Sequence, residues 1–484
     1  TNLYFYINAD EATTGVVYGL NFKEEFSVTP GKTTTITLPS ESFEMTQSDE
    51  VENKGIHIVA KKEITVYGLN KQSYTTDGYL ALPTDVLGTS YINLGYQNTD
   101  VVNSTQFGIV ASEDGTTVTI VPSRNTGKHA AGMPYVISLN QGQTYMLRNE
   151  DAAPADLSGS IITANKPIAV FGGMQCANIP ANYVACDYLI EQLPPTTAWG
   201  KNFMSVPLKT RQNGDTFRFL SSADNTSIEI NGRLLVTLNK GQYYETILAS
   251  ASQIKANNPI MVAQYANSST FDNAMGDPFM SVLTPFEQYL GDYQFSTPTL
   301  GFEKNFVNIT VQKEGAGKIL LDGQAIPDDS FFPIGSSGFI GAQIDISSGT
   351  HRLDGGNFPV GAFIYGFNES DSYGYPGGQS FGPIALAAKA ALTTSAPDAT
   401  GKVNEQHCLQ TSITDIFGNP LQGIRVDFNI TGSNGENRGF AFTSKEGTAA
   451  YCYTGTNAGE DKIIALSAGL DASILFTWTK TAEN

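Results

Sequence analysis

The residue types that most often carry catalysis do not form a catalytic pattern in this chain. The four histidines are far apart in the sequence: His57, His129, His351 and His407. None stands in an HExxH or other metal-binding spacing, so metal-dependent hydrolysis has no support. Residues 378–382 (GQSFG) match the GxSxG nucleophile elbow, but that motif needs a buried strand before it, and residues 373–377 (YGYPG) are typical of a turn. We therefore predict that the protein is not an enzyme.

Three aspartates recur at equivalent positions, each with a bulky residue just after it: Asp77 with Tyr79, Asp187 with Tyr188, and Asp277 with Phe279. Three such carboxylates could bind calcium or ligand hydroxyl groups, while the aromatic rings stack on sugar rings. Alternatively, each Asp opens a turn and accepts backbone N–H groups, while the rings fill a core or a seam between units. No DxDxDG loop of the EF-hand type supports calcium, so no cofactor is predicted.

Two loops combine aromatic residues with small polar residues, which is the composition of adaptable binding surfaces. They are residues 177–183, which include Tyr183, and residues 372–375, which include Tyr373. A disulfide between Cys176 and Cys186 would constrain the first loop, which we expect to be the binding site. The alternative is a loop that the disulfide only stabilises.

The four cysteines occur as two local pairs, Cys176 with Cys186 and Cys408 with Cys452, whose members could lie on neighbouring turns or strands. We predict two disulfides, which indicates an extracellular protein. The alternative is a set of free core thiols in a cytosolic protein. A zinc site is disfavoured because the chain has no CxxC pair.

Composition indicates an all-β protein of several domains. In a chain of 484 residues, Gly (48), Pro (22), Tyr (22) and Phe (27) are abundant while only 15% of residues are charged, which favours turn-rich β-structure. The formal net charge of −19 disfavours nucleic acid and anionic lipid as partners. The chain contains no run of about 18 apolar residues, the length needed to span a membrane, so no membrane insertion is predicted. The N-terminal segment lacks the features of a signal peptide, which indicates a mature chain or a fragment.

An internal repeat with a spacing of roughly 100 residues organises the first part of the chain. Its clearest signature is an apolar strand, found at residues 62–70, 166–174, 258–266 and 358–368. A turn followed by alternating apolar and polar residues precedes it, at residues 113–120 and 223–230. The stretch that links one unit to the next is degenerate in the fourth copy, at residues 371–376, as expected for a terminal unit that need not pack against a successor.

The repeat predicts four antiparallel β-sandwich or barrel-like units, at roughly residues 1–92, 93–205, 206–296 and 297–383. Residues 384–400 are small, Ala-rich and without aromatics, which predicts a linker with at most a turn or two of helix. Residues 401–484 form a separate block. Its strands alternate apolar and polar residues, and its turns recur about every 8–12 residues, which is the spacing of a β-sandwich.

The most specific stretches of the repeat are residues 76–83 (TDGYLALP) with Leu87 and Gly88, and residues 186–195 (CDYLIEQLPP) with Trp199 and Gly200. Through them, residues 1–383 resemble the N-terminal domain of the IgGFc-binding protein family, found in mucin-associated secreted proteins and in many bacterial surface proteins. The resemblance implies extracellular binding of protein or mucus. Nothing in these residues shows Fc binding.

Residues 414–428 (TDIFGNPLQGIRVDF) and 443–449 (TSKEGTA) are similar to bacterial immunoglobulin-like domains of the invasin and intimin type. The likeness extends over residues 400–482 and implies a spacer, because such domains usually stack as rods that hold a binding tip away from the cell. Cys408 and Cys452 depart from the common pattern, and we expect them to join adjacent strands.

The sequence therefore predicts a non-catalytic binding or adhesion segment of a large bacterial surface protein, at the cell surface or secreted. Its expected partners are an extracellular glycoprotein, mucin or glycan, and further domains of the same surface protein. The alternative from another class is a structural stalk or filament subunit with mainly self-contacts. A carbohydrate hydrolase would need paired acids in a cleft, which a sequence cannot place.

Overall fold

The structure is a computed structural model. It describes residues 2–99, 103–149, 151–299, 301–356, 358–380, 399–415, 420–421, 424–435, 437–467 and 470–480, and the backbone of residues 387–394. The regular elements are almost all antiparallel β-strands, which confirms the predicted all-β class. No helix among the described residues is long and apolar enough to cross a membrane.

The first unit contains two sheets, with strand orders β4-β1-β7-β8 and β3-β2-β6. Its elements are β1 (Asn2–Asn8), β2 (Thr13–Gly19), β3 (Phe22–Val28), β4 (Thr34–Leu38), α1 (Ser40–Phe43), β5 (Val51–Glu52), β6 (His57–Ala60), β7 (Thr65–Gln72) and β8 (Thr75–Leu80). Strand β5 pairs with β13 of the second unit, so the two units share a sheet.

The second and third units have the same topology, as their shared sequence signatures predict. The second contains β9 (Gly88–Ile92), β10 (Thr105–Ala111), β11 (Thr116–Val121), β12 (Tyr135–Leu139), β13 (Thr144–Asn149), β14 (Ile161–Ala177) and β15 (Asp187–Leu193). The third contains β16 (Gly200–Ser205), β17 (Asp215–Ser221), β18 (Thr226–Ile230), β19 (Arg233–Leu238), β20 (Tyr243–Leu248), β21 (Ser252–Tyr265), α2 (Ser269–Asp272) and β22 (Met280–Val282). The strand order is β12-β11-β14-β10-β13 in one and β19-β18-β21-β17-β20 in the other.

The fourth unit again contains two sheets, with orders β23-β29-β25-β26 and β27-β28-β24-β30-β31. Its strands are β23 (Asp292–Thr297), β24 (Lys304–Gln312), β25 (Leu320–Leu321), β26 (Gln324–Ala325), β27 (Phe331–Pro333), β28 (Phe339–Ile346), β29 (Gly349–Asp354), β30 (Val360–Asn368) and β31 (Asp371–Pro376). Short 3-10 turns lie between strands: η1 (Thr84–Val86), η2 (Thr196–Ala198), η3 (Phe286–Gln288), η4 (Lys313–Gly315) and η5 (Asp328–Ser330).

The unit boundaries lie one strand earlier than the sequence predicts. Strands β9, β16 and β23 pair with β14, β21 and β29, each in the unit that follows. The predicted boundaries near residues 92, 205 and 296 therefore fall after the first strand of the next unit. The repeat signatures mark the strands themselves, but not the sheet that a connecting strand joins.

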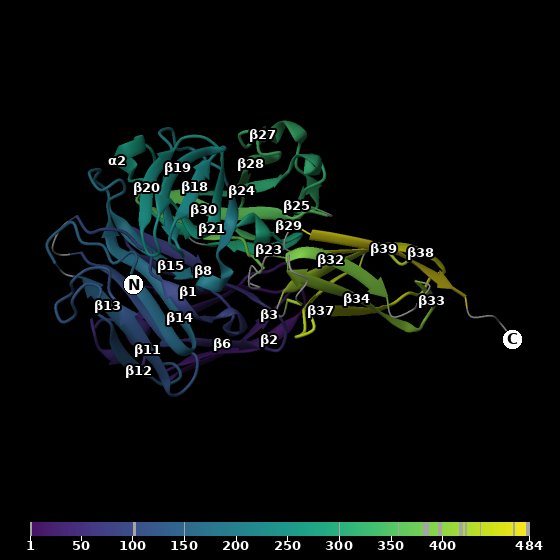
Figure 1. Ribbon diagram of the computed structural model, residues 1–484, viewed down its shortest axis with the longest axis horizontal. Helices are drawn as coiled ribbons and strands as arrows, with labels where there is room; N and C mark the ends of the chain where they lie inside the picture. The colour runs from purple at the N-terminus through teal and green to yellow at the C-terminus, as the bar shows by residue number, and fades with distance from the viewer. Residues whose placement is uncertain are drawn as a thin grey trace.

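The four units close into a ring. Strands β8, β15, β22 and β31 occupy equivalent places in the four units, and we call them the central strands. Strand β8 lies against β15 and β31, and β22 lies against the same two, so the central strands meet in cyclic order. Figure 1 shows β8 beside β15 near the middle of this ring.

Closure of the ring corrects the expectation that the fourth unit has no neighbour to pack against. The ring of Tyr375 in β31 stacks on that of Tyr67 in β7, with centroids 4.5 Å apart. The Tyr67 hydroxyl also donates to the carbonyl of Gly377 over 2.6 Å. The degenerate motif at residues 371–376 therefore packs against the first unit rather than marking a free end.

The C-terminal block is a two-sheet sandwich that extends from one side of the ring (Figure 1). Its strands are β32 (Ala387–Thr394), β33 (Thr400–Lys402), β34 (Gln406–Asp415), β35 (Arg425–Gly432), β36 (Asn437–Phe442), β37 (Thr448–Thr454), β38 (Gly459–Ser467) and β39 (Leu470–Thr479). The sheets have orders β32-β34-β37 and β33-β39-β38-β35-β36.

The predicted linker at residues 384–400 needs correction. Residues 387–394 form β32, which pairs antiparallel with β34 and so belongs to the sandwich. The small side chains suggested a linker, but the backbone groups of this segment that face β34 are satisfied by the pairing, which makes it an edge strand of the sheet. The other predicted linker residues that the structure describes, 399 and 400, lead into and begin β33.

Candidate functional site

Four hairpins, one in each unit, connect a long strand to the central strand that follows it. Their turns are residues 73–74, 178–186, 266–279 and 369–370. The central strands begin side by side: the Thr76 amide donates to Asp187, the Thr76 hydroxyl to Asp371, and the Ser372 hydroxyl to the carbonyl of Asp277. The four turns therefore gather at one end of the ring, which we call the hairpin face.

Asp77 lies beneath the hairpin face and joins three units. One carboxylate oxygen accepts the amide of Gly78 over 2.8 Å, and the other accepts those of Ile190, at 3.0 Å, and Met280, at 3.2 Å. These amides belong to the first unit, the second unit and the start of β22 in the third. The side chain is fully buried, so its contacts are those of the structural alternative.

Asp187 makes similar contacts between the first two units. It accepts the amide of Thr76 over 2.9 Å and its neighbour Tyr188's amide over 2.7 Å, and the hydroxyl of Thr75 also donates to it. Asp277 is almost fully buried and is hydrogen-bonded by the side chain of Ser269. The side chains of Asp77 and Asp187 therefore contact neighbouring units, whereas Asp277 reaches the fourth unit through its backbone carbonyl, which accepts the Ser372 hydroxyl.

Burial dominates the electrostatics of this junction. It raises the pKa of Asp77 and of Asp187 well above the usual range, although hydrogen bonds partly offset the effect. Burial also raises the pKa of Asp277, with the Ser269 hydroxyl and the Arg211 charge opposing it. Within the part of the chain that the structure describes, no group of three His, Cys, Asp or Glu side chains could hold a metal ion. Calcium binding at these aspartates stays untested.

The aromatic residues that follow these aspartates fill seams between units. Phe279 is fully buried, with its ring about 6 Å from those of Phe363 and Phe367 in the fourth unit. Tyr79 is partly buried and contacts Phe171 edge-on, with centroids 5.2 Å apart. Sugar stacking on these rings stays a prediction.

Two further predicted site residues are held by hydrogen bonds. Tyr188 is partly buried and is hydrogen-bonded by the side chain of Asn70. Residues 372–375, predicted as a loop and as part of a turn over 373–377, instead lie in the buried strand β31, and the fully buried Tyr373 donates its hydroxyl to the side-chain oxygen of Asn305 over 2.7 Å. Of the eight residues predicted to bind a ligand, Tyr183 alone is classed as exposed.

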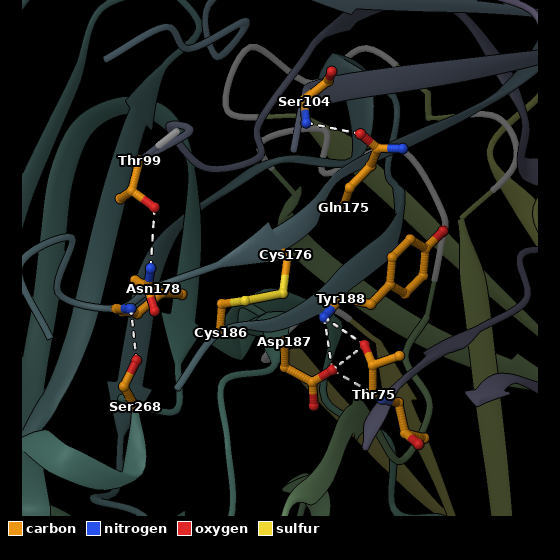
Figure 2. Close-up of a disulfide and its surroundings, with 12 residues drawn as sticks. Thr75, Thr99, Ser104, Gln175, Cys176, Asn178, Cys186, Asp187, Tyr188 and Ser268 are labelled. Carbon is orange, nitrogen blue, oxygen red and sulfur yellow. Dashed lines mark hydrogen bonds between the residues drawn. A yellow bond between two sulfur atoms is a disulfide. The ribbon is translucent and has the colours of Figure 1, made fainter. Parts of the chain in front are cut away.

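The predicted disulfide between Cys176 and Cys186 is present and closes the loop of the second hairpin (Figure 2). The loop is anchored on both sides. Ile179 is buried, and its amide donates to the hydroxyl of Ser268 in the third unit over 2.9 Å. The side-chain amide of Asn178 donates to Thr99 over 3.0 Å. The base of the loop is thus held in place by neighbouring segments.

The tip of this loop carries apolar side chains that face solvent. Tyr183 is 41% exposed and Val184 is 73% exposed. The Tyr183 ring meets Phe271 of α2 edge-on, with centroids 4.8 Å apart, and the carbonyl of Val184 accepts the hydroxyl of Thr270 over 2.6 Å. The tip is therefore supported by the third unit while its apolar surface stays accessible.

Sequence reasoning missed two other exposed apolar residues of the hairpin face. Tyr74, in the first hairpin, is 76% exposed, and Met275, in the third, is 40% exposed. Both stand among small or polar neighbours, as Tyr183 does, so the composition rule that selected residues 177–183 could have found them. Together with Tyr183 and Val184, they are exposed apolar side chains on the turns of three of the four hairpins.

The second predicted disulfide, Cys408 to Cys452, is also present. Its cysteines stand opposite each other in β34 and β37, as expected for a disulfide that joins adjacent strands. It lies in the C-terminal sandwich and takes no part in the hairpin face.

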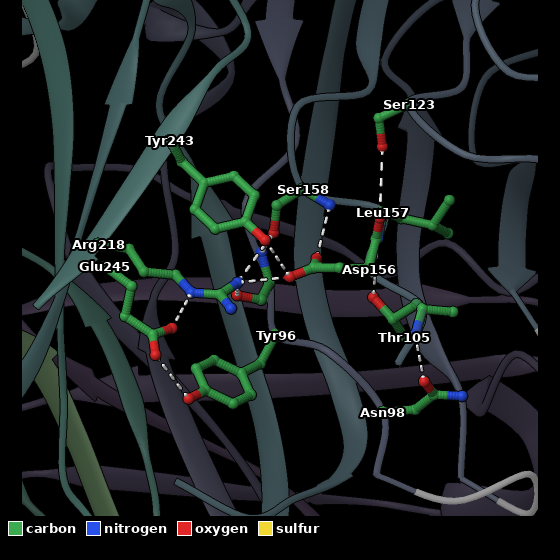
Figure 3. Close-up of polar contacts among 12 residues, drawn as sticks. Tyr96, Asn98, Thr105, Ser123, Asp156, Leu157, Ser158, Arg218, Tyr243 and Glu245 are labelled. Atoms are coloured by element: carbon green, nitrogen blue, oxygen red, sulfur yellow. Dashed lines mark hydrogen bonds and ion pairs between the residues drawn. The ribbon is translucent and has the colours of Figure 1, made fainter. Parts of the chain in front are cut away.

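A buried arginine that sequence reasoning also missed joins the second and third units (Figure 3). Arg218 donates to Asp156 over 2.8 Å and to Glu245 over 2.7 Å. Its guanidinium lies over the ring of Tyr96, 4.1 Å from the centroid. Burial disfavours the charge, but the carboxylates outweigh it and the pKa of Arg218 is raised further. Burial alone would raise the pKa of Asp156, which the Arg218 charge and hydrogen bonds from Ser158 instead lower.

Comparison with known proteins identifies the family to which the ring region is related. A sequence profile described as IgGFc binding protein matches residues 77–366, which is more than half of the chain. The chain belongs to the IgGFc-binding protein family. The human IgGFc-binding protein is 24% identical to this family member over 315 residues, which make up 63% of the present chain and 6% of the human protein. The chain thus spans a small part of that relative's length.

Two solved adhesin structures are similar to this family member at a low level. A bacterial ice-binding adhesin is 11% identical, with a TM-score of 0.18, and the match covers 82% of this chain and all of the other. The Escherichia coli adhesin FdeC is 12% identical, with a TM-score of 0.17, over 58% of this chain and 96% of that one. These TM-scores are too low to indicate a common fold. The invasin- or intimin-like nature of residues 400–482 stays a prediction.

Proposed function

We propose that this member of the IgGFc-binding protein family is a non-catalytic extracellular binding module that holds a glycoprotein partner on the hairpin face. The observation that carries the proposal is that the turns of three hairpins on this face expose apolar side chains, namely Tyr74, Tyr183, Val184 and Met275. Exposed apolar side chains on one face are typical of protein interaction sites. The two disulfides support an extracellular location.

The hairpin face is suited to tight binding because the loop that carries Tyr183 and Val184 is already ordered. The Cys176–Cys186 disulfide and the contacts of Ile179 hold the loop, so little conformational freedom is lost when a partner binds. Tyrosine also offers a large contact area at a small entropic cost, together with a hydroxyl for hydrogen bonding. We further propose that the partner is a mucin and that the chain is a segment of a larger bacterial surface protein.

The proposal can be tested with a double variant of the loop tip, Tyr183→Ser with Val184→Ser, in the full chain. The probes are an immunoglobulin Fc fragment and a purified secreted mucin, each immobilised on a biosensor. We expect at least one probe to bind the unchanged chain and to bind the double variant about 10-fold or more weakly, since central apolar anchors dominate interfaces. Leu234→Ser, which alters an exposed leucine on β19, is the matched control and is expected to bind normally.

Two outcomes would count against the proposal. If the double variant binds as tightly as the Leu234→Ser control, the hairpin face is not the site. If neither probe binds and the chain forms concentration-dependent oligomers in sedimentation, the stalk or filament alternative is favoured. Circular dichroism of each variant checks that the fold is retained.

A further inference from the structure

A cleft of about 570 Å³ lies between the third and fourth units. The third unit lines it with residues 207–211, Asn231, Ser250 and Ala251, and the fourth with Phe332, Pro333, Gly335 and Gln343. Its volume falls within the roughly 300–1,000 Å³ typical of small-molecule sites. None of the apolar residues of the hairpin face contributes to it, so it is a separate candidate site.

Thr210, at the rim of this cleft, has a strained backbone. Its φ is +75°, in the left-handed region that β-branched residues rarely adopt. Such a conformation costs about 1–3 kcal/mol and persists only where the surroundings impose it. Strained residues of this kind concentrate at functional sites, which makes the contacts around Thr210 informative.

The residues before Thr210 are fixed by hydrogen bonds. The amide of Leu208 donates to Asp215 over 2.8 Å, and the amide of Lys209 donates to the hydroxyl of Tyr365 over 2.7 Å. Asp215 and Tyr365 are themselves buried. The backbone just before Thr210 is therefore fixed by contacts from both the third and the fourth unit.

The residues after Thr210 are equally fixed. The Arg211 side chain is fully buried, with its guanidinium over the ring of Phe367, 4.2 Å from the centroid. The amides of Gln212 and Asn213 both donate to Asp272, over 3.2 and 2.9 Å. The strain at Thr210 is thus maintained from both sides of the turn.

The polar groups that face this cleft are left available for a ligand. Neither the amide nor the hydroxyl of Thr210 has a hydrogen-bond partner among the described residues, and the same holds for the hydroxyl of Ser250. Gln343 donates its side-chain NH2 to the carbonyl of Pro207 over 2.6 Å, and its side-chain oxygen accepts no hydrogen bond from the described residues. Donors and acceptors are therefore both present.

The ionic side chains that line this cleft are already neutralised or turned inward. The Lys209 ammonium forms an ion pair with Asp345, and the Arg211 guanidinium is buried beside Asp272. Phe332 and Pro333 add an apolar wall on the opposite side. The cleft thus fits a neutral molecule that has several hydroxyl groups and one apolar face.

We propose that the cleft between the third and fourth units binds a neutral sugar residue of a glycan. A pyranose ring presents hydroxyl groups as both donors and acceptors at its edge, and an apolar C–H face that packs on an aromatic ring. Thr210, Ser250 and Gln343 would bind the hydroxyl groups, and Phe332 would lie against the C–H face. The inference does not depend on the hairpin face.

The test uses saturation-transfer NMR and calorimetry on the full chain with D-galactose, N-acetyl-D-glucosamine and N-acetyllactosamine. We expect at least one of these neutral sugars to bind saturably, and the charged sugar N-acetylneuraminic acid to bind at least 10-fold more weakly. Ser250→Trp should fill the cleft and reduce the binding at least 10-fold. Ala249→Trp, one residue away and outside the lining, is the matched control and should bind as the unchanged chain does.

Thr210→Gly provides a second variant that keeps the fold, because glycine adopts a positive φ without strain. We expect this variant to bind the sugar several-fold more weakly, because it lacks the hydroxyl. The proposal is overturned if no neutral sugar in the panel binds, or if Ser250→Trp binds like Ala249→Trp. The loop-tip variant, Tyr183→Ser with Val184→Ser, should retain sugar binding, which separates failure here from failure of the hairpin-face proposal.

Discussion

Arg218 of the third unit donates to Asp156 of the second over 2.8 Å, and both side chains are almost fully buried. The pair therefore places two opposite charges inside the seam between two units of the ring. Tyr243 adds a hydrogen bond to Asp156 over 3.0 Å, and Glu245 accepts a second one from Arg218. A network of this kind fixes the position of one unit relative to the next, provided that every member is present.

Replacing Arg218 with Met should be strongly destabilising, because it leaves the buried carboxylate of Asp156 without its cation. We expect a loss of about 3–5 kcal/mol in the free energy of unfolding. The measurement is the midpoint of urea unfolding followed by tryptophan fluorescence and circular dichroism. Arg233→Met, on the exposed strand β19, should change the free energy by about 0.5 kcal/mol or less. A cost for Arg218→Met no larger than that of the control would contradict the structural role.

The same arginine shows where prediction from sequence ends. The repeat signatures located β7, β14, β21 and β30, because alternating apolar residues and Pro or Gly turns are local properties. Arg218 lies between Phe217 and Phe219, and strict alternation would place it on a solvent face. Every residue of β17 is instead buried, because the second unit covers the other side of the strand. Contacts between units are non-local and leave no periodic signal.

The candidate site was predictable only in part for a similar reason. Local composition selected the loop that contains Tyr183, and the cysteine spacing gave its disulfide. The aspartates were found as a repeated feature, but whether Asp77 faces solvent or the amides of Ile190 and Met280 depends on closure of the ring. The cleft beside Thr210 had no signal at all, since its walls are far apart in the sequence.

Asp77→Ala tests whether the repeated aspartates are structural. It would leave the amides of Ile190 and Met280 buried without an acceptor, so we expect a loss of about 3 kcal/mol in unfolding free energy. Asp85→Ala, at an exposed position in η1, is the control and should have little effect. Thermal unfolding with and without calcium completes the test. A calcium-dependent rise in Tm for the unchanged chain that Asp77→Ala abolishes would favour the ion-binding alternative instead.

Stability should fall as the pH rises through neutrality. Burial raises the pKa of Glu191 to about 8, while hydrogen bonds from Val282 and Ser281 limit the rise. The folded protein therefore keeps a proton that the unfolded chain releases above its ordinary pKa, so this contribution is fully present at low pH and is lost as the pH passes through about 8. Between pH 6 and pH 9 we expect a loss of about 2–3 kcal/mol from this group.

Urea unfolding at several pH values checks this expectation. Glu191→Gln should make the dependence between pH 6 and pH 9 clearly shallower, because the amide does not titrate. Glu303→Gln, an exposed position, should leave the dependence unchanged. Equal slopes in the unchanged chain and in Glu191→Gln would show that Glu191 does not hold a proton in the folded state.

Cys176→Ser should weaken partner binding while leaving the rest of the ring folded. The disulfide closes a loop between cysteines ten residues apart in sequence, and its loss releases the Tyr183 and Val184 tip. We expect binding of the probe that recognises the unchanged chain to fall about 10-fold, with faster hydrogen exchange confined to residues 177–185. Cys408→Ser breaks the other disulfide and should leave binding unchanged. Normal binding by Cys176→Ser would remove this loop from the proposed site.

The C-terminal sandwich should detach from the ring more readily when its arginines are neutralised. Arg438 bonds Asp354 over 2.9 Å and Asp292 over 3.2 Å, and Arg425 pairs with Glu63 over 3.4 Å. These side chains are partly exposed, so each pair contributes about 1 kcal/mol or less and weakens with salt. Arg425→Gln with Arg438→Gln should raise the radius of gyration measured by small-angle X-ray scattering, whereas Arg233→Gln should not. In the unchanged chain, 1 M salt should shift the radius in the same direction. A radius unaffected both by salt and by the double variant would show that these ion pairs do not hold the sandwich against the ring.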